Sequence, residues 1–144
     1  MRPKDPFSQF RDFINLMENR VNHLAAVYGI EKLAGPQGFA VMYLCEDKGK
    51  EIFIKDIEKR LNISKSVTSN LVKRMEKNGF IQVIPSKVDK RYKQVVLTEL
   101  GESKAKAIKA FHDEMHDQVL KGISREDLRT FFRVFKQALK NLEK

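Results

Sequence analysis

The sequence predicts a mainly α-helical fold with one short two-stranded hairpin. Apolar residues recur at steps of three and four along most of the chain, which is the spacing of one face of a helix. Two runs rich in β-branched residues, 80–84 and 94–97, flank the polar segment PSKVDKRYK and are typical of a hairpin. The expected order is two helices, a short extended piece at 51–54, two helices, the hairpin and two further helices.

The charge of the chain is concentrated in its middle third. The 144 residues are 42% hydrophobic, which is enough to build the core of one domain or of a small domain with accessory helices. Residues 48–94 hold 13 Lys and Arg against 5 Asp and Glu, whereas the rest of the chain holds 15 against 14. Nearly the whole net charge of +9 therefore lies in one segment, as expected of a surface that displaces counterions from phosphates.

The same composition argues against a membrane protein and against a secreted one. The longest apolar run, Phe39–Cys45, is too short to span a bilayer. The basic residues do not follow one face of a long amphipathic helix, so we expect no membrane partner. The N-terminus, MRPKDPF, lacks the apolar stretch of a signal peptide, and a single cysteine cannot form an internal disulfide. We therefore expect a cytoplasmic protein.

The first two helices are predicted from an apolar stripe and from the glycine and proline residues that follow it. The stripe covers 6–30, and Gly29 marks its end. Pro36 is well placed to open the next helix. That second helix, at 36–47, is apolar on most faces, so we expect it to be buried.

The third and fourth helices are expected to be joined by a tight turn. The third helix covers 54–61 and ends at Asn62. Ser64 can cap the fourth helix by accepting a hydrogen bond from a free backbone N–H. That helix covers 65–78, and Gly79 stops it because glycine adopts a left-handed conformation at little cost.

The last two helices follow the hairpin. Thr98 is expected to cap a helix over 99–120 that ends at Gly122. Ser124 and Asp127 have the spacing of a capping box for the last helix. The first and last helices both carry aromatic-rich stripes that must be covered. A homodimer built through these helices would bury them and would relate its two subunits by a twofold axis.

The third and fourth helices with the hairpin form a helix-turn-helix with an appended wing. On the fourth helix, one face is apolar and is expected to pack inward. The opposite face carries side chains that are short near the N-terminal end, so the helix could approach base edges closely. A helix that is merely exposed to water would instead carry long Glu and Lys side chains there. With the capping Ser64, this reading face comprises Lys65, Ser66, Val67, Ser69, Asn70 and Lys73.

The hairpin tip supplies a second set of candidate DNA contacts. Arg91 suits a narrow minor groove, whose negative potential attracts a guanidinium group. Asp89 would be unusual in a purely phosphate-binding patch, but it makes sense if it orients Arg91. A solvated hairpin tip would carry similar charges, and the position directly after the reading helix favours the DNA interpretation. The residues expected mainly to hold phosphates are Lys73, Arg74, Lys87 and Lys90.

These residues carry a resemblance to a known family. The segment 54–101 resembles the winged helix-turn-helix of the multiple antibiotic resistance regulator (MarR) family, and the flanking helices agree in number and order. Ile57-Glu58 stands where the family commonly has Leu-Ala at the contact between the two helices, and we expect Glu58 to point outward. The matching motifs are Ile63-Ser64-Lys65-Ser66, Leu71-Val72, Met75–Gly79, the wing D-x-R at Asp89-Lys90-Arg91, and L-T-x-x-G at Leu97–Gly101.

The resemblance implies an obligate dimer that binds pseudo-palindromic duplex DNA and usually represses promoters. It implies helical dimerisation regions at 1–34 and 99–144 around a winged helix-turn-helix domain at 35–98. It also assigns the recognition helix to Lys65–Asn78 and the minor-groove arginine to Arg91. Members of the family often release DNA when a small molecule, a metal or an oxidant binds, so a small-molecule effector is an expected partner.

Three features are candidates for such sensing. His112 and His116 lie one turn apart and could share a metal, but two ligands do not make a site, so we assign no metal and no cofactor. Cys45 lies on an apolar helix and is expected in the core rather than as a redox sensor. Aromatic residues near the junction of the first, second and fifth helices could line an apolar cleft, although core packing predicts the same residues: Phe13, Tyr28, Phe39, Tyr43 and Phe111.

Two other classes of function compete with a DNA-binding regulator. An enzyme is disfavoured because the chain shows no Ser/His/Asp arrangement, no phosphate-cradling glycine loop and no paired carboxylates. A winged-helix module that binds RNA or another protein is the other alternative, together with a metal- or redox-responsive regulator of the same fold. Single-strand readers stack bases on exposed aromatics, and this wing offers only Tyr92, so duplex DNA is favoured.

Overall fold

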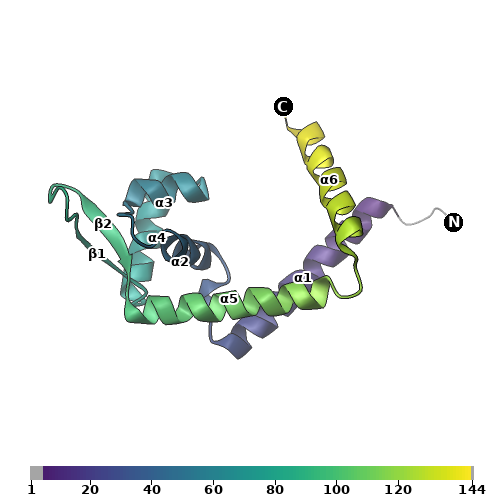
Figure 1. Cartoon of the computed structure of the whole chain (residues 1–144), viewed down its shortest axis with the longest axis horizontal. Coiled ribbons are helices and arrows are strands. Elements are labelled where there is room, and N and C mark those ends of the chain that lie inside the picture. The colour runs from purple at the N-terminus through teal and green to yellow at the C-terminus, as the bar shows by residue number, and fades with distance from the viewer. Residues whose placement is uncertain (1–4, 144) are drawn as a thin grey trace. The chain divides into compact units, whose positions relative to one another are not determined.

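The computed structural model describes residues 5–143, except for the side chain of Pro6, and has the predicted order of helices and strands (Figure 1). The chain divides into two compact units, one ending at His112 and the other beginning at Asp113. A short 3-10 helix, η1, was not predicted. The first strand is shifted by one residue from its predicted range, and the second begins one residue earlier than predicted. The elements are α1 (Pro6–Tyr28), η1 (Glu31–Leu33), α2 (Pro36–Glu46), α3 (Ile54–Leu61), α4 (Lys65–Lys77), β1 (Ile81–Pro85), β2 (Lys93–Leu97), α5 (Glu99–Val119) and α6 (Arg125–Leu142).

The helix ends have the predicted local causes. Gly29 adopts φ 69° and its N–H bonds back to the last turn of α1, and Asn62 ends α3 at φ 52°. Both residues tolerate the left-handed conformation that closes a helix. The Ser64 hydroxyl accepts a hydrogen bond from the Val67 N–H at 3.2 Å and thereby caps α4. Ser124 caps α6 in the same way.

The core of the first unit holds α4 in place. α4 packs against α2, α3 and β1, and its buried face consists of the four predicted residues Thr68, Leu71, Val72 and Met75. On α3, Ile57 is fully buried, whereas Glu58 is half-buried rather than pointing freely into solvent. The two strands pair antiparallel from Ile81↔Leu97 to Pro85↔Lys93. In Figure 1 the resulting hairpin projects from the end of α4.

The start of α5 is fixed against the base of this hairpin by a close backbone approach. A side-chain Cβ placed on Gly101 would lie 2.1 Å from the carbonyl oxygen of Phe80. The Thr98 hydroxyl donates a hydrogen bond to the carbonyl oxygen of Gly79 at 2.5 Å and accepts one from the Gly101 N–H at 3.0 Å. The L-T-x-x-G motif therefore joins the end of α4, the hairpin and α5 at one point.

Two helices leave large apolar faces uncovered within a single chain. No described side chain of α6 is buried, and Phe131 and Leu142 are 51% and 81% exposed. α1 likewise exposes Phe7, Phe10 and Phe13. Among the described residues, no helix is long and apolar enough to cross a membrane.

The prediction that α2 would be buried on most faces was wrong in one respect. Ala40, Val41 and Leu44 are buried, but Phe39 is 67% exposed. The reason is geometric, because Phe39 lines an open cleft between α2 and its neighbouring elements instead of packing against them.

Candidate nucleic-acid interface

α4 presents the predicted polar face to solvent. Its first turn exposes Lys65, Ser66 and Val67, whereas Ser69 is half-buried. Ser66 lies 3.3 Å from the capping Ser64, oxygen to oxygen. Because the opposite face is locked in the core, this row of short side chains has a fixed orientation. Asn70, Lys73 and Arg74 continue the exposed surface.

At the hairpin tip, Asp89 holds Arg91. Two nitrogens of the Arg91 guanidinium donate to the Asp89 carboxylate, the shorter bond being 2.7 Å from Nη2 to Oδ2. The backbone N–H of Arg91 also donates to Asp89. The Arg91 side chain remains 84% exposed. The ion pair therefore orients the guanidinium but contributes little to the stability of the fold. Hydrogen bonds from Arg91 lower the pKa of the Asp89 carboxyl, and the predicted orienting role of Asp89 matches this geometry.

A second bracing residue, Glu51, was missed by the sequence reasoning. Its carboxylate accepts a hydrogen bond from the Ser86 hydroxyl at 2.5 Å and one from the Lys87 backbone N–H at 2.7 Å. The Ser86 oxygen in turn accepts from the backbone N–H groups of Val88 and Asp89. The hydroxyl bond to Ser86 is the main reason why the pKa of Glu51 is lowered. This network ties the tip of the wing to the segment before α3. The only sequence signal was one acid within a basic stretch.

The predicted site residues thus fall into two exposed groups of the first unit. The reading face of α4 forms one group, and the wing forms the other. In the wing, Lys87, Lys90 and Arg91 are exposed and Asp89 is half-buried.

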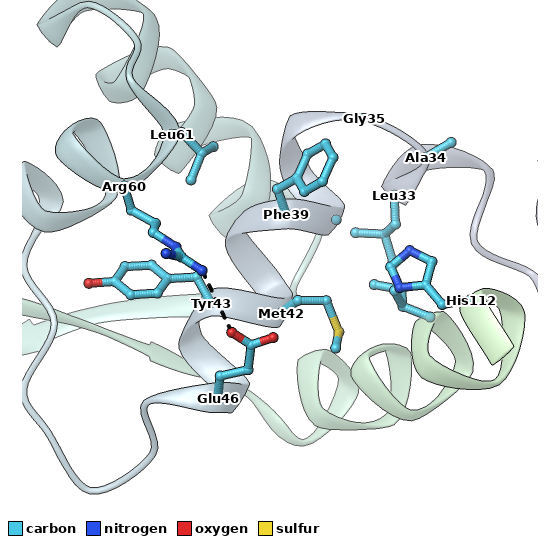
Figure 2. Close-up of a pocket in the computed structure, with 12 residues that line it drawn as sticks. Leu33, Ala34, Gly35, Phe39, Met42, Tyr43, Glu46, Arg60, Leu61 and His112 are labelled. Atoms are coloured by element: carbon cyan, nitrogen blue, oxygen red, sulfur yellow. Dashed lines mark ion pairs between the residues drawn. The ribbon is translucent and has the colours of Figure 1, made fainter. Parts of the chain in front are cut away.

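A cleft of about 500 Å³ lies elsewhere in the first unit, between η1, α2, α3 and α5 (Figure 2). Leu33, Phe39 and Met42 give it an apolar lining, and His112 contributes from α5. The guanidinium of Arg60 lies 5.6 Å from the centre of the Tyr43 ring. Burial is the main reason why the pKa of Tyr43 is raised.

The predicted aromatic lining was therefore only partly right. Phe39 and Tyr43 line the cleft, but Phe13, Tyr28 and Phe111 do not. Phe111 is buried and meets Tyr28 edge-to-face at 6.3 Å between ring centres. Phe111 therefore packs in the core and does not line the cleft.

Two histidines and one cysteine are the remaining sensing candidates. His112 and His116 are both exposed on α5, and Cys45 is half-buried rather than fully in the core. Over residues 5–143, no group of three or more His, Cys, Asp or Glu side chains is placed to hold a metal ion.

Comparison with known proteins places this architecture. The MarR family model matches residues 33–91, which include α4 and the wing as far as Arg91. The chain belongs to the MarR family. It is therefore a DNA-binding transcription regulator with a winged helix-turn-helix fold.

Individual relatives extend this likeness over most of the chain. The transcriptional regulator SarZ of Staphylococcus haemolyticus is 28% identical over 103 residues, which cover 72% of this chain and 68% of SarZ. The heme sensor protein PefR of Streptococcus agalactiae, solved in complex with heme, is 46% identical with a TM-score of 0.82 and covers 97% of this chain and 95% of PefR. The S. aureus MepR–DNA complex has the same fold at 22% identity, with a TM-score of 0.76 over 96% of this chain and 97% of MepR.

Proposed function

We propose that this MarR-type regulator is a homodimeric repressor that binds pseudo-palindromic operators and is released by heme. One observation supports the DNA-binding part of this proposal. A rigid face of α4 with short side chains lies in the same unit as a wing arginine that Asp89 orients. α4 enters the major groove, where Asn70 and Ser66 contact base edges. Arg91 enters the adjacent minor groove. A dimer occupying promoter DNA excludes the transcription machinery.

Dimerisation is supported by two independent observations, the uncovered apolar face of α1 and that of α6. A face with Phe131 and Phe132 about half exposed is costly in water. A second copy would cover it and would present two α4 helices to successive half-sites. We further propose helical dimerisation regions at 1–34 and 99–144 around a DNA-binding domain at 35–98.

Heme is proposed as the effector because PefR, a heme sensor by name, shares 46% of its sequence with this chain. The residues of this chain suit such a ligand. Heme iron is commonly held by an imidazole, and the porphyrin needs an apolar surface. His112 and His116 are exposed on α5, and His112 lies beside the apolar cleft.

Substitution of the α5 histidines tests the effector. We expect His112→Ala or His116→Ala to weaken heme binding by about tenfold or more, because loss of an iron ligand removes a coordinate bond. Titration followed by the heme absorption spectrum would measure the effect. His23→Ala, an exposed histidine on α1, serves as the matched control. Unchanged heme affinity in both α5 variants would exclude ligation by these histidines, and no heme binding by the wild type would exclude heme as the effector.

Selection of bound fragments from random duplex DNA tests the DNA-binding mode. The wild type should recover an inverted repeat with half-sites about one helical turn apart. Arg91→Ala should weaken binding by roughly 1–3 kcal/mol and lose selectivity only at the flanking minor-groove positions. Lys87→Ala should weaken binding to all sequences alike. It should also reduce the slope of log affinity against log salt concentration by about one. Flanking selectivity that survives in Arg91→Ala would contradict the wing assignment.

A further inference from the structure

A second cleft, the backbone cleft, opens between α3, α4 and β2 in the first unit. It has a volume of about 520 Å³. Its rim carries one lysine from each element: Lys55, Lys65 and Lys93. Lys55 and Lys93 were not among the residues that the sequence marked for DNA contact.

The lining of the backbone cleft combines cationic and apolar surface. The three lysines are exposed, and they face one acid, Glu58, so the lining carries a formal charge of +2. Phe53 and Tyr92 form an apolar wall, with their rings edge-to-face at 6.3 Å between centres. A cation rim over an aromatic wall fits a sugar–phosphate unit, whose deoxyribose is largely apolar and whose phosphate is an anion.

The position of the backbone cleft decides which anion it meets. If α4 lies in the major groove and the wing lies in the adjacent minor groove, one strand of the duplex separates the two grooves. That strand must pass between α4 and the wing, where the backbone cleft lies. A free phosphate or an acidic peptide would have no such reason to be there.

We propose that the backbone cleft seats the sugar–phosphate segment that separates the two grooves. Lys55, Lys65 and Lys93 surround one phosphate, and the Tyr92 ring contacts the adjoining deoxyribose. This inference rests on the proposed docking of α4 and the wing. It adds a contact that fixes the register of both elements on the duplex without reading any base.

Glu58 gives the proposal a second, opposite signature. A carboxylate beside a seated phosphate repels it. Glu58→Gln should therefore tighten binding, whereas Lys55→Ala and Lys93→Ala should weaken it. A cleft that does not contact DNA would give only the small opposite effects of a change in net charge, which salt screens.

Neutral phosphate scanning tests the proposal on the whole 144-residue chain. Single phosphates of the selected duplex are replaced by uncharged methylphosphonates, and dissociation constants are measured for the wild type and for each variant. Each lysine variant should lose about tenfold in affinity near 0.1 M salt. The slope of its log affinity against log salt concentration should fall by about one. Lys32→Ala is the control, because Lys32 is exposed on η1 and is not part of the backbone cleft.

The decisive result is a loss of additivity. The wild type should lose about tenfold when one or two adjacent phosphates between the major- and minor-groove contacts are neutralised. Lys55→Ala and Lys93→Ala should lose nothing further at those phosphates, whereas Lys32→Ala should behave as the wild type. Lysine variants that bind the native duplex normally, or that remain sensitive to the same phosphate, would overturn the proposed role of the backbone cleft and leave the proposed function standing. A wild type that selects no duplex would overturn the proposed function and this inference together.

Discussion

Phe135→Asp is expected to convert the proposed homodimer into monomers and to abolish sequence-specific DNA binding. The Phe135 ring stacks on Phe131 with 5.9 Å between ring centres and 9° between planes, and both rings are exposed in the single chain. Burying a carboxylate in a subunit interface is strongly unfavourable. Because each subunit would then hold only one half-site, affinity should fall by about a thousandfold, toward non-specific binding.

Sedimentation and DNA titration would measure the two effects, and Gln137→Asp is the matched control. Both substitutions add one negative charge and introduce the same residue into α6. Two positions along a helix correspond to a rotation of roughly 200°, so Gln137 lies on the side away from Phe135. Circular dichroism of the Phe135→Asp protein reports whether the protein remains folded. A Phe135→Asp protein that remains dimeric would contradict the use of α6 in the interface.

The features that could be predicted from the sequence are those with local causes. Gly29 and Asn62 end their helices because their own backbone preferences allow positive φ. Ser64 caps α4 through a bond spanning three residues. Asp89 orients Arg91 from two residues away. Periodicity alone was sufficient to identify the buried face of α4.

The features that were missed depend on residues far apart in the sequence. Glu51 reaches Ser86 across 35 positions, and no spacing rule connects an acid before a helix to a hydroxyl at a strand end. The exposure of Phe39 depends on which side of α2 its neighbours cover. Lys55 and Lys93 resemble ordinary solvated lysines until the fold brings them to one cleft. Local propensity contains none of this information.

Gly101→Ala should destabilise the protein, against the direction that helix propensity gives. Gly101 lies in the first turn of α5, where propensity alone would favour alanine by up to about 1 kcal/mol. The added Cβ, however, would lie 2.1 Å from the Phe80 carbonyl oxygen. That oxygen is a backbone atom and accepts a hydrogen bond from the Thr98 N–H at 3.0 Å, so it cannot move aside alone. We expect a net loss of about 2 kcal/mol in the free energy of unfolding.

Urea unfolding would measure this loss, with Ser103→Ala on the same helix as the control. Ser103 is exposed, and its replacement should change the free energy of unfolding by less than about 0.5 kcal/mol. If Gly101→Ala proved as stable as the wild type, the close approach of α5 to the hairpin base would be wrong. If it proved less stable, its DNA affinity should also fall, because relief of the contact at Phe80 requires the hairpin or α5 to shift. The same backbone contact would then govern both the stability of the fold and the placement of Arg91 relative to α4.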